Sequence, residues 1–188
     1  NLGPRQGGHA TGAMGGGDGS GAARRGSDPL WLYALYPVAL LNYLWINSKP
    51  NPFYAILEGR APATILHEDD LCIVFRDIFP LSSTHLLVIP REHIHSWPKL
   101  DPRHAELVEH LHNVGKMVLS QEGVEEDESF FGFMTPPFIS VPQLHLHCLR
   151  LPLKAKSPMD RIRKGIMLDT SKMMHPERLV RRLNRKRK

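Results

Sequence analysis

Cysteine is scarce in this chain of 188 residues, which holds only Cys72 and Cys148. Two cysteines are too few for a disulfide scaffold or for a zinc site with four cysteine ligands. Hydrophobic residues make up 41% and charged residues 23% of the chain. These ordinary values exclude a wholly disordered, fibrous or collagen-like protein, and the length predicts about one domain.

Acidic residues are scarce near the C-terminus, although the net charge of the whole chain is only +5. Residues 151–188 hold 13 of the 24 lysines and arginines but only three of the 19 acidic residues. We interpret residues 152–188 as a basic C-terminal extension, in which Leu179 and Leu183 predict a short amphipathic helix. Such a tail could bind nucleic acid, contact an anionic membrane, act as a nuclear signal or stay solvated.

Large apolar side chains are almost absent from residues 1–28, which hold 10 of the 15 glycines. This segment cannot bury enough surface to offset its ordering entropy, so we expect it to be flexible and disordered. Residues 30–46 instead have no charge and carry aromatic residues near both ends. This stretch could be a short membrane anchor, a docking helix or poorly ordered sequence. We expect a cytoplasmic or nuclear protein, with membrane anchoring through residues 30–46 as an alternative.

Residues 51–151 show the patterns of an α+β domain. Asn51 followed by Pro52 predicts a helix start, and Gly59 follows where that helix would stop. Asp101 and Pro102 predict a second helix that runs to about residue 119. Apolar runs predict strands at residues 71–75, 86–89, 130–133 and 144–149. We therefore expect an antiparallel sheet with a central helix packed on it.

A row of polar side chains lies in the last predicted strand. Because side chains alternate along a strand, Gln143, His145 and His147 share one face, and apolar residues occupy the other. Two imidazoles at this spacing could bind a metal such as zinc. One of them could also act as a nucleophile while its neighbour donates hydrogen bonds. The row could equally be the solvated face of a half-buried strand.

Two segments resemble the signatures of the histidine-triad (HIT) nucleotide-binding proteins. The first comprises Asp-Ile-Phe-Pro at residues 77–80 and Thr-His-Leu-Leu-Val-Ile-Pro-Arg-Glu-His at residues 84–93. The second is Gln-Leu-His-Leu-His-Cys-Leu at residues 143–149, similar to His-x-His-x-His with apolar x. The Pro-Pro-Phe loop within residues 132–140 is similar to that of the third Hint branch. The resemblance covers residues 51–151 and implies a HIT fold, a homodimer and no cofactor or metal.

The resemblance further implies hydrolysis of purine nucleoside phosphoramidates or similar nucleotide conjugates, as in adenosine 5'-monophosphoramidases. In this family, the middle triad histidine attacks the α-phosphorus, and water then releases the nucleoside monophosphate from a nucleotidyl-histidine. By position, His145 is the nucleophile, and the backbone carbonyl of Gln143 fixes its tautomer. His147 would donate to a phosphate oxygen, His85 would brace the strand beside Gln143, and Ser140 would lie near the leaving group.

The resemblance also assigns residues to the nucleoside. Asp77 matches the acidic residue that accepts hydrogen bonds from the ribose hydroxyls, a geometry that suits a carboxylate and a diol. Five apolar residues match the walls around the base: Phe53, Ile56, Phe75, Ile78 and Leu87.

Departures from the family pattern leave alternatives. The first triad position is Gln143 rather than His, and Met134 stands where relatives commonly carry His. Glutamine can replace histidine if that position only supplies a carbonyl and a side-chain hydrogen bond, because its amide both donates and accepts. If an imidazole ring there tunes the nucleophile, activity would be lower. The alternatives are a catalytically weak nucleotide-binding scaffold and a nucleic-acid-binding protein that uses its basic tail.

We interpret several other histidines and Cys148 as structural, whereas His67 and His175 belong to no recognisable group of functional residues. We expect His93 and His95 to be structural. We expect His104, His110 and His112, on the predicted central helix, to lie at the surface or at a dimer interface. Cys148 is expected to point away from the histidine row and to be buried.

Overall fold

The computed structural model describes residues 51–136, 138–153 and 170–187. The predictions for residues 1–50, including the apolar stretch at 30–46, lie outside these residues. Within the described ranges, no helix has the length and apolar character needed to cross a membrane.

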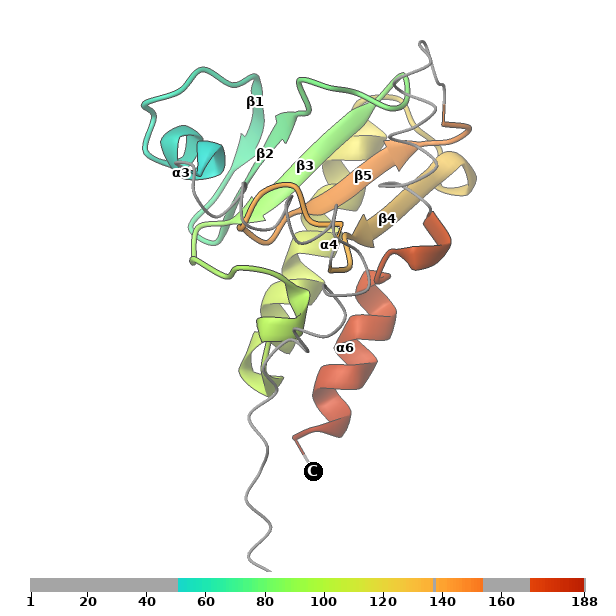
Figure 1. Cartoon of the computed structure of the whole chain (residues 1–188). Helices are drawn as coiled ribbons and strands as arrows, with labels where there is room; N and C mark the ends of the chain where they lie inside the picture. The colour runs from blue at the N-terminus through green and yellow to red at the C-terminus, as the bar shows by residue number, and fades with distance from the viewer. Residues whose placement is uncertain (1–50, 137, 154–169, 188) are drawn as a thin grey trace, which may run out of the picture. The chain divides into compact units, whose positions relative to one another are not determined.

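Five strands form one antiparallel sheet in the order β1-β2-β3-β5-β4 (Figure 1). The strands are β1 (Ile65–Glu68), β2 (Cys72–Arg76), β3 (His85–Pro90), β4 (Ser129–Phe133) and β5 (Leu146–Arg150). The predicted α+β class with an antiparallel sheet is therefore confirmed. The last strand starts at Leu146 rather than at 144, because the backbone N–H of Leu144 donates to the carbonyl of Ile94 outside the sheet ladder.

In the described ranges, three helices accompany the sheet, namely α3 (Pro52–Leu57), α4 (Ala105–Gln121) and α6 (Pro176–Arg185). Short 3-10 turns precede or follow them at Trp97–Lys99, Pro102–His104, Glu126–Glu128 and Thr170–Lys172. The side chain of Asn51 caps α3 by accepting from the backbone N–H of Phe53 at 3.0 Å. Asp101 caps the turn that leads into α4, as its position before proline predicts.

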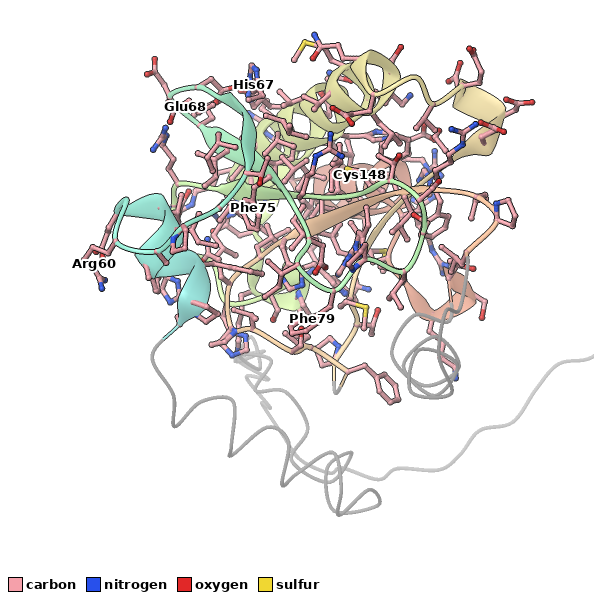
Figure 2. All side chains as sticks on the ribbon, turned by 90° about the horizontal axis from the view of Figure 1, so that it is seen from above. Arg60, His67, Glu68, Phe75, Phe79 and Cys148 are labelled. Atoms are coloured by element: carbon pink, nitrogen blue, oxygen red, sulfur yellow. The ribbon has the colours of Figure 1, made fainter. Side chains whose placement is uncertain are left out.

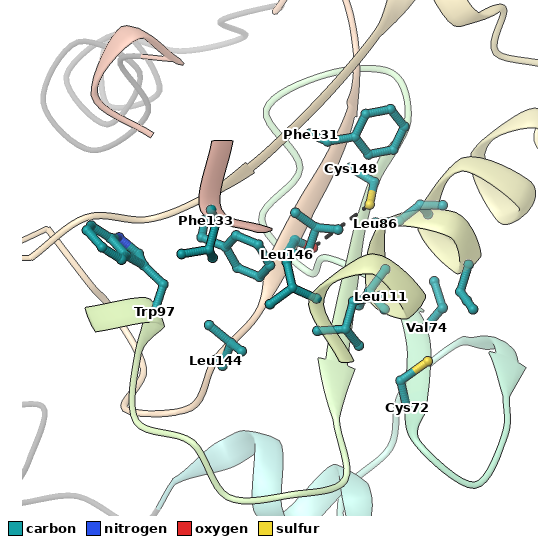
Figure 3. Packing of buried hydrophobic residues seen from close by; sticks show 14 of the residues in the cluster. Cys72, Val74, Leu86, Trp97, Leu111, Phe131, Phe133, Leu144, Leu146 and Cys148 are labelled. Atoms are coloured by element: carbon teal, nitrogen blue, oxygen red, sulfur yellow. Dashed lines mark hydrogen bonds between the residues drawn. The ribbon is translucent and has the colours of Figure 1, made fainter. Parts of the chain in front are cut away.

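The central helix α4 covers one face of the sheet and encloses the main hydrophobic core (Figure 3). A Cβ atom added to Gly115 would lie 2.7 Å from the sulfur of Cys148, so glycine lets α4 approach β5 closely. Cys148 is fully buried and points into this core, as expected. Figure 3 also labels other side chains of this core, among them Val74, Leu86, Leu111, Phe131, Phe133, Leu144 and Leu146.

Helix α6 lies within residues 152–188, the segment interpreted above as a basic extension. It packs against α4 and β4. Leu179 and Leu183 are only 1% and 2% exposed and belong to the main core, so the predicted amphipathic helix is confirmed. The guanidinium of Arg182 lies 5.2 Å from the ring centroid of Trp97. The remaining arginines of α6 are exposed.

A smaller apolar cluster occupies the opposite face of the sheet. Phe53 of α3 packs edge-on against Phe75 of β2, with their ring centroids 5.6 Å apart. Ile73, Leu87 and Ile89 complete the buried part of this cluster. The cluster therefore places α3 beside the strands that carry the polar residues described below.

Two histidines of the α4 region are buried, contrary to the expectation from the sequence. His104 and His112 are only 5% and 6% exposed, so the expectation of a surface or dimer-facing position was wrong for both. His104 accepts a hydrogen bond from the backbone N–H of Asp101 within the cap of the helix. His112 packs edge-on against Phe131 inside the core. A polar cap and an aromatic contact thus explain their burial.

Candidate active site

The register of β3 and β5 brings two histidines together on the sheet face opposite α4. His147 lies opposite Leu87 and His85 lies opposite Leu149, so both imidazoles project from the same face. The Nε2 atom of His85 lies 2.9 Å from Nδ1 of His147. The structure therefore places His85 against His147, and the expectation that it braces the strand beside Gln143 was wrong.

Gln143 is completely buried, and its side chain is saturated with hydrogen bonds. Its Nε2 group donates to the carbonyls of Pro90 and Glu92, each at 3.0 Å. Its Oε1 atom lies 2.8 Å from Nδ1 of His93 and accepts from it. The residue that braces Gln143 is therefore His93, which the sequence analysis gave only an unspecified structural role.

The fixed Gln143 in turn determines the tautomer of His145. The backbone carbonyl of Gln143 lies 2.6 Å from Nδ1 of His145 and can only accept, so this nitrogen carries the proton. The lone pair of the neutral ring is consequently on Nε2. His145 is 4% exposed, and its ring lies edge-on to Phe53 at 5.2 Å.

A chain of hydrogen bonds likewise determines the tautomer of His147. The backbone N–H of Leu81 donates to Nδ1 of His85 at 3.4 Å, so His85 carries its proton on Nε2. That proton points to Nδ1 of His147, and Asp77 Oδ2 lies 3.5 Å from the same His85 nitrogen. His147 therefore carries its proton on Nε2, a buried atom with no hydrogen-bond partner among the described residues. This N–H is a donor directed at no group of the described chain.

Burial keeps both triad imidazoles neutral. Desolvation lowers the pKa of His145, against the opposing effects of the Gln143 carbonyl and the Asp77 carboxylate. Desolvation also lowers the pKa of His147, and the neighbouring His145 and His85 lower it further. The two rings, 4.9 Å apart, thus offer one lone pair and one N–H donor at neutral pH. The polar row is buried rather than solvated, which rules out the solvated-face interpretation.

The other predicted site residues lie around this pair with different exposure. The cluster beside His145 contains Phe53, Phe75 and Leu87, with Ile56 packed against it. Ile78 is instead 79% exposed and is not part of this cluster. Asp77 Oδ1 accepts from the backbone N–H of Phe79 at 2.7 Å. Ser140, the last predicted site residue, is exposed, and Met134, a departure from the family pattern, is buried.

Two groups of side chains in the described part of the chain could hold a metal ion. One comprises Asp77, His85 and His147, and the other comprises Asp69, Cys72 and His110. The first group belongs to the hydrogen-bond chain described above. The second lies on the α4 face of the sheet.

The model of the family described as "Scavenger mRNA decapping enzyme C-term binding" matches residues 51–162, more than half of the chain. Among solved structures, the HIT family hydrolase from Legionella pneumophila is 31% identical with a TM-score of 0.51, covering 58% of this chain and 99% of that one. A HIT family hydrolase from Clostridium thermocellum is 25% identical with a TM-score of 0.53, covering 58% and 97%.

The curated proteins with similar sequences include several HINT proteins. The chain is 40% identical over 102 residues to the Arabidopsis thaliana protein named "Bifunctional adenosine 5'-phosphosulfate phosphorylase/adenylylsulfatase HINT4", covering 53% of this chain and 69% of that protein. It is 42% identical over 104 residues to "Adenosine 5'-monophosphoramidase HINT3" of Danio rerio, covering 54% and 65%. The HINT3 protein of Xenopus tropicalis is 39% identical over 88 residues, covering 46% and 58%. The chain thus spans about 58–69% of these relatives.

Fold, paired signatures and family match together define a histidine-triad protein, and the chain belongs to that superfamily. Within it, the chain is of the Hint type and is similar to the HINT3 proteins.

Proposed function

We propose that the protein hydrolyses nucleotide conjugates, specifically purine nucleoside phosphoramidates, through a nucleotidyl-histidine and releases the nucleoside monophosphate. The observation that carries the proposal is the pair of fixed tautomers, a lone pair on His145 Nε2 beside an N–H donor on His147 Nε2. The printed names of the HINT3 relatives, adenosine 5'-monophosphoramidases, support the substrate class.

The first chemical step needs a neutral nucleophile. His145 Nε2 attacks the α-phosphorus, the P–N bond breaks, and the leaving amine takes up a proton from solvent. The Gln143 carbonyl holds the His145 N–H and stabilises the positive charge that develops on the ring. Water then attacks the phosphorus and loses a proton to solvent, and the P–N bond to His145 breaks, which restores the neutral imidazole.

The second reactive side chain, His147, stabilises the phosphate. His147 Nε2–H has no partner in the described chain, so donating it to a non-bridging oxygen satisfies a buried donor as charge accumulates there. His85 fixes this orientation through His147 Nδ1 and is a positioning residue. Asp77 lies beside His85, and its carboxylate also opposes the lowering of the His145 pKa.

The nucleoside would lie over the cluster on the α3 side. Phe53 contacts both Phe75 and the ring of His145, so a base held against Phe53 brings the α-phosphorus close to the nucleophile. Asp77 is assigned to the ribose hydroxyls, and Ser140 to the leaving group. The exposed Ile78 would join the wall around the base only when a nucleoside covers it.

The direct test is steady-state hydrolysis of adenosine 5'-phosphoramidate by the full chain. Replacing His145 by Gly should abolish turnover, and added imidazole should restore part of it, since it can occupy the ring's place. Cys148→Ala is a matched control, because Cys148 lies close to His145 in the chain, in β5, but on the core face. Brief reaction followed by mass spectrometry should detect an AMP adduct on His145.

Other outcomes would decide between the alternatives. Wild-type turnover in His145→Gly would disprove the mechanism. AMP binding without turnover or adduct would favour a catalytically weak scaffold. In that case, the low activity would be explained by glutamine in place of histidine at position 143.

The exposed arginines of α6 favour a second function, binding of a nucleic-acid backbone. Arg178, Arg181 and Arg185 are exposed while the leucines of the same helix are buried, so a row of positive charge faces outward. Replacing the three by Gln should weaken binding of a single-stranded RNA oligonucleotide and flatten its dependence on salt. Three exposed arginines elsewhere, Arg60, Arg91 and Arg103, provide the matched control. Equal effects in both variants would contradict a role for α6.

A further inference from the structure

A second cluster of metal-ligating side chains lies away from the triad, where the turn between β1 and β2 meets α4. His67 lies opposite Val74, a residue of the α4-side core, so its ring projects toward the helix. Figure 2 shows His67 at the margin of the sheet on the α4 side and Phe79 on the opposite side. His110 approaches from α4, and Cys72 begins β2. Asp69 lies in the turn between β1 and β2.

The carboxylate of Asp69 is the centre of this cluster. Its Oδ1 atom accepts from the backbone N–H groups of Leu71 and Cys72, both at 2.8 Å, which fixes the carboxylate. Its Oδ2 atom lies 2.9 Å from His110 Nε2, 3.3 Å from His67 Nε2 and 3.7 Å from Cys72 Sγ. Three potential ligand atoms therefore converge on one oxygen.

These distances resemble the edges of a zinc tetrahedron. Zinc binds nitrogen and oxygen at about 2.0–2.2 Å and sulfur at about 2.3 Å, so tetrahedral ligands lie roughly 3.3–3.8 Å apart. The ligand atoms of Asp69, Cys72 and His110 all lie within 4.8 Å of one another. His67 lies outside this group, so its ring must rotate to add a second imidazole to the carboxylate, thiolate and imidazole of the other three. This mixed set of nitrogen, oxygen and sulfur donors suits zinc better than magnesium or calcium.

Three of the four side chains are partly exposed, and Cys72 is fully buried. The side chains of His67, Asp69 and His110 are each about one third exposed or less, at 29%, 27% and 34%. Metal binding would displace the thiol proton of Cys72 and the two N–H protons that now point at Asp69.

We propose that His67, Asp69, Cys72 and His110 form a zinc site that joins the β1–β2 turn to α4. Four protein ligands leave no open position, so the ion is structural rather than catalytic. The site is independent of the proposed hydrolysis, because its ligands are on the sheet face opposite His147. Bound zinc stabilises the fold by favouring the native state, in which alone these ligands converge.

The test uses cobalt(II) as a spectroscopic substitute for zinc on the untagged, chelator-treated full chain. One equivalent of cobalt should produce a thiolate-to-cobalt charge-transfer band, and zinc should abolish it. Cys72→Ser should remove the band, whereas Cys148→Ser should keep it, because Cys148 is buried beside Gly115 away from these ligands. The other group of potential ligands, around His147, has no cysteine and cannot produce this band.

A second variant tests the site independently, in case Cys72→Ser does not fold. His110→Gln alters a half-buried helix residue and should weaken zinc affinity at least about tenfold and reduce the zinc-induced rise in Tm. His147→Asn should keep both. A wild-type chain without the band, a band that survives Cys72→Ser, or zinc affinity unchanged in His110→Gln would each overturn the proposal.

Discussion

The two faces of the sheet differ in chemistry, although the same strands form both. On the α4 side, apolar residues of β5 such as Leu146 and Cys148 enter the main core. On the α3 side, His147 of the same strand joins His85 in a buried polar chain. Alternation along one strand thus separates the residues that stabilise the fold from those proposed to react. Substitutions on the two faces should therefore separate in their effects on stability and turnover.

Among the variants that compare the two faces, the largest expected effect is on turnover, from His147→Phe. This change removes the Nε2–H donor but keeps a ring of similar shape, so kcat should fall by about 10²–10³. Stability should change by less than about 1 kcal/mol, because Asp77, 3.5 Å away, can accept the proton of His85 instead. Stopped assays measure kcat, and urea unfolding measures the free energy of unfolding. A loss of stability that accounts for the lost turnover would contradict the separation of the faces.

Gln143→Glu should affect both quantities. The carboxylate would oppose the carbonyls of Pro90 and Glu92, which now accept from the amide, in a fully buried position. We expect a loss of about 3 kcal/mol in the free energy of unfolding and a fall in kcat, since the Gln143 carbonyl orients His145. His93→Phe removes one of the three side-chain bonds and should cost about 1 kcal/mol. Equal losses in the two variants would show that the carbonyl contacts of Gln143 contribute little.

Gly115→Ala tests the apolar face alone. The added methyl group would lie 2.7 Å from Cys148 Sγ, so we expect a loss of about 1–2 kcal/mol after the gain in helix propensity. The double variant with Cys148→Ala should recover most of that loss, because it removes the clashing sulfur. Turnover per folded molecule should stay unchanged in both. Unequal kcat values would show that packing under β5 controls the reactive face.

The sequence predicts the separation of the faces but not the contacts across strands. Alternation alone assigns Leu144, Leu146 and Cys148 to the core, and the structure agrees. The contact of His85 with His147 depends on the register of β3 and β5, which lie about 60 residues apart in the chain. No local pattern fixes that register, and the resemblance to relatives gave His85 the wrong neighbour.

Buried polar side chains are hard to predict for a related reason. The partners of Gln143 come from the segment after β3, and His93 became identifiable as its brace only in three dimensions. His112 carried a usable signal, because Val108 and Gly115 lie on the same face of the helix. Its polarity instead suggested a surface position, since histidine is less often fully buried than apolar residues are.

The most selective effect concerns pH and His112. Burial, helped by Lys116 and His175, lowers the pKa of His112 from 6.5 to about 4, although Glu177 opposes the shift. The unfolded chain therefore binds the proton more readily, so this residue costs stability as pH falls below 6.5, by about 2 kcal/mol between pH 7 and 5. His112→Phe keeps the edge contact with Phe131 and removes a buried nitrogen, Nε2, that has no hydrogen-bond partner among the described residues. Urea unfolding at the two pH values should show a smaller acid loss in the variant, by that amount. His145 and His147 titrate in both proteins, so their contribution cancels, and an unchanged difference would show that His112 is protonated in the folded core at pH 5.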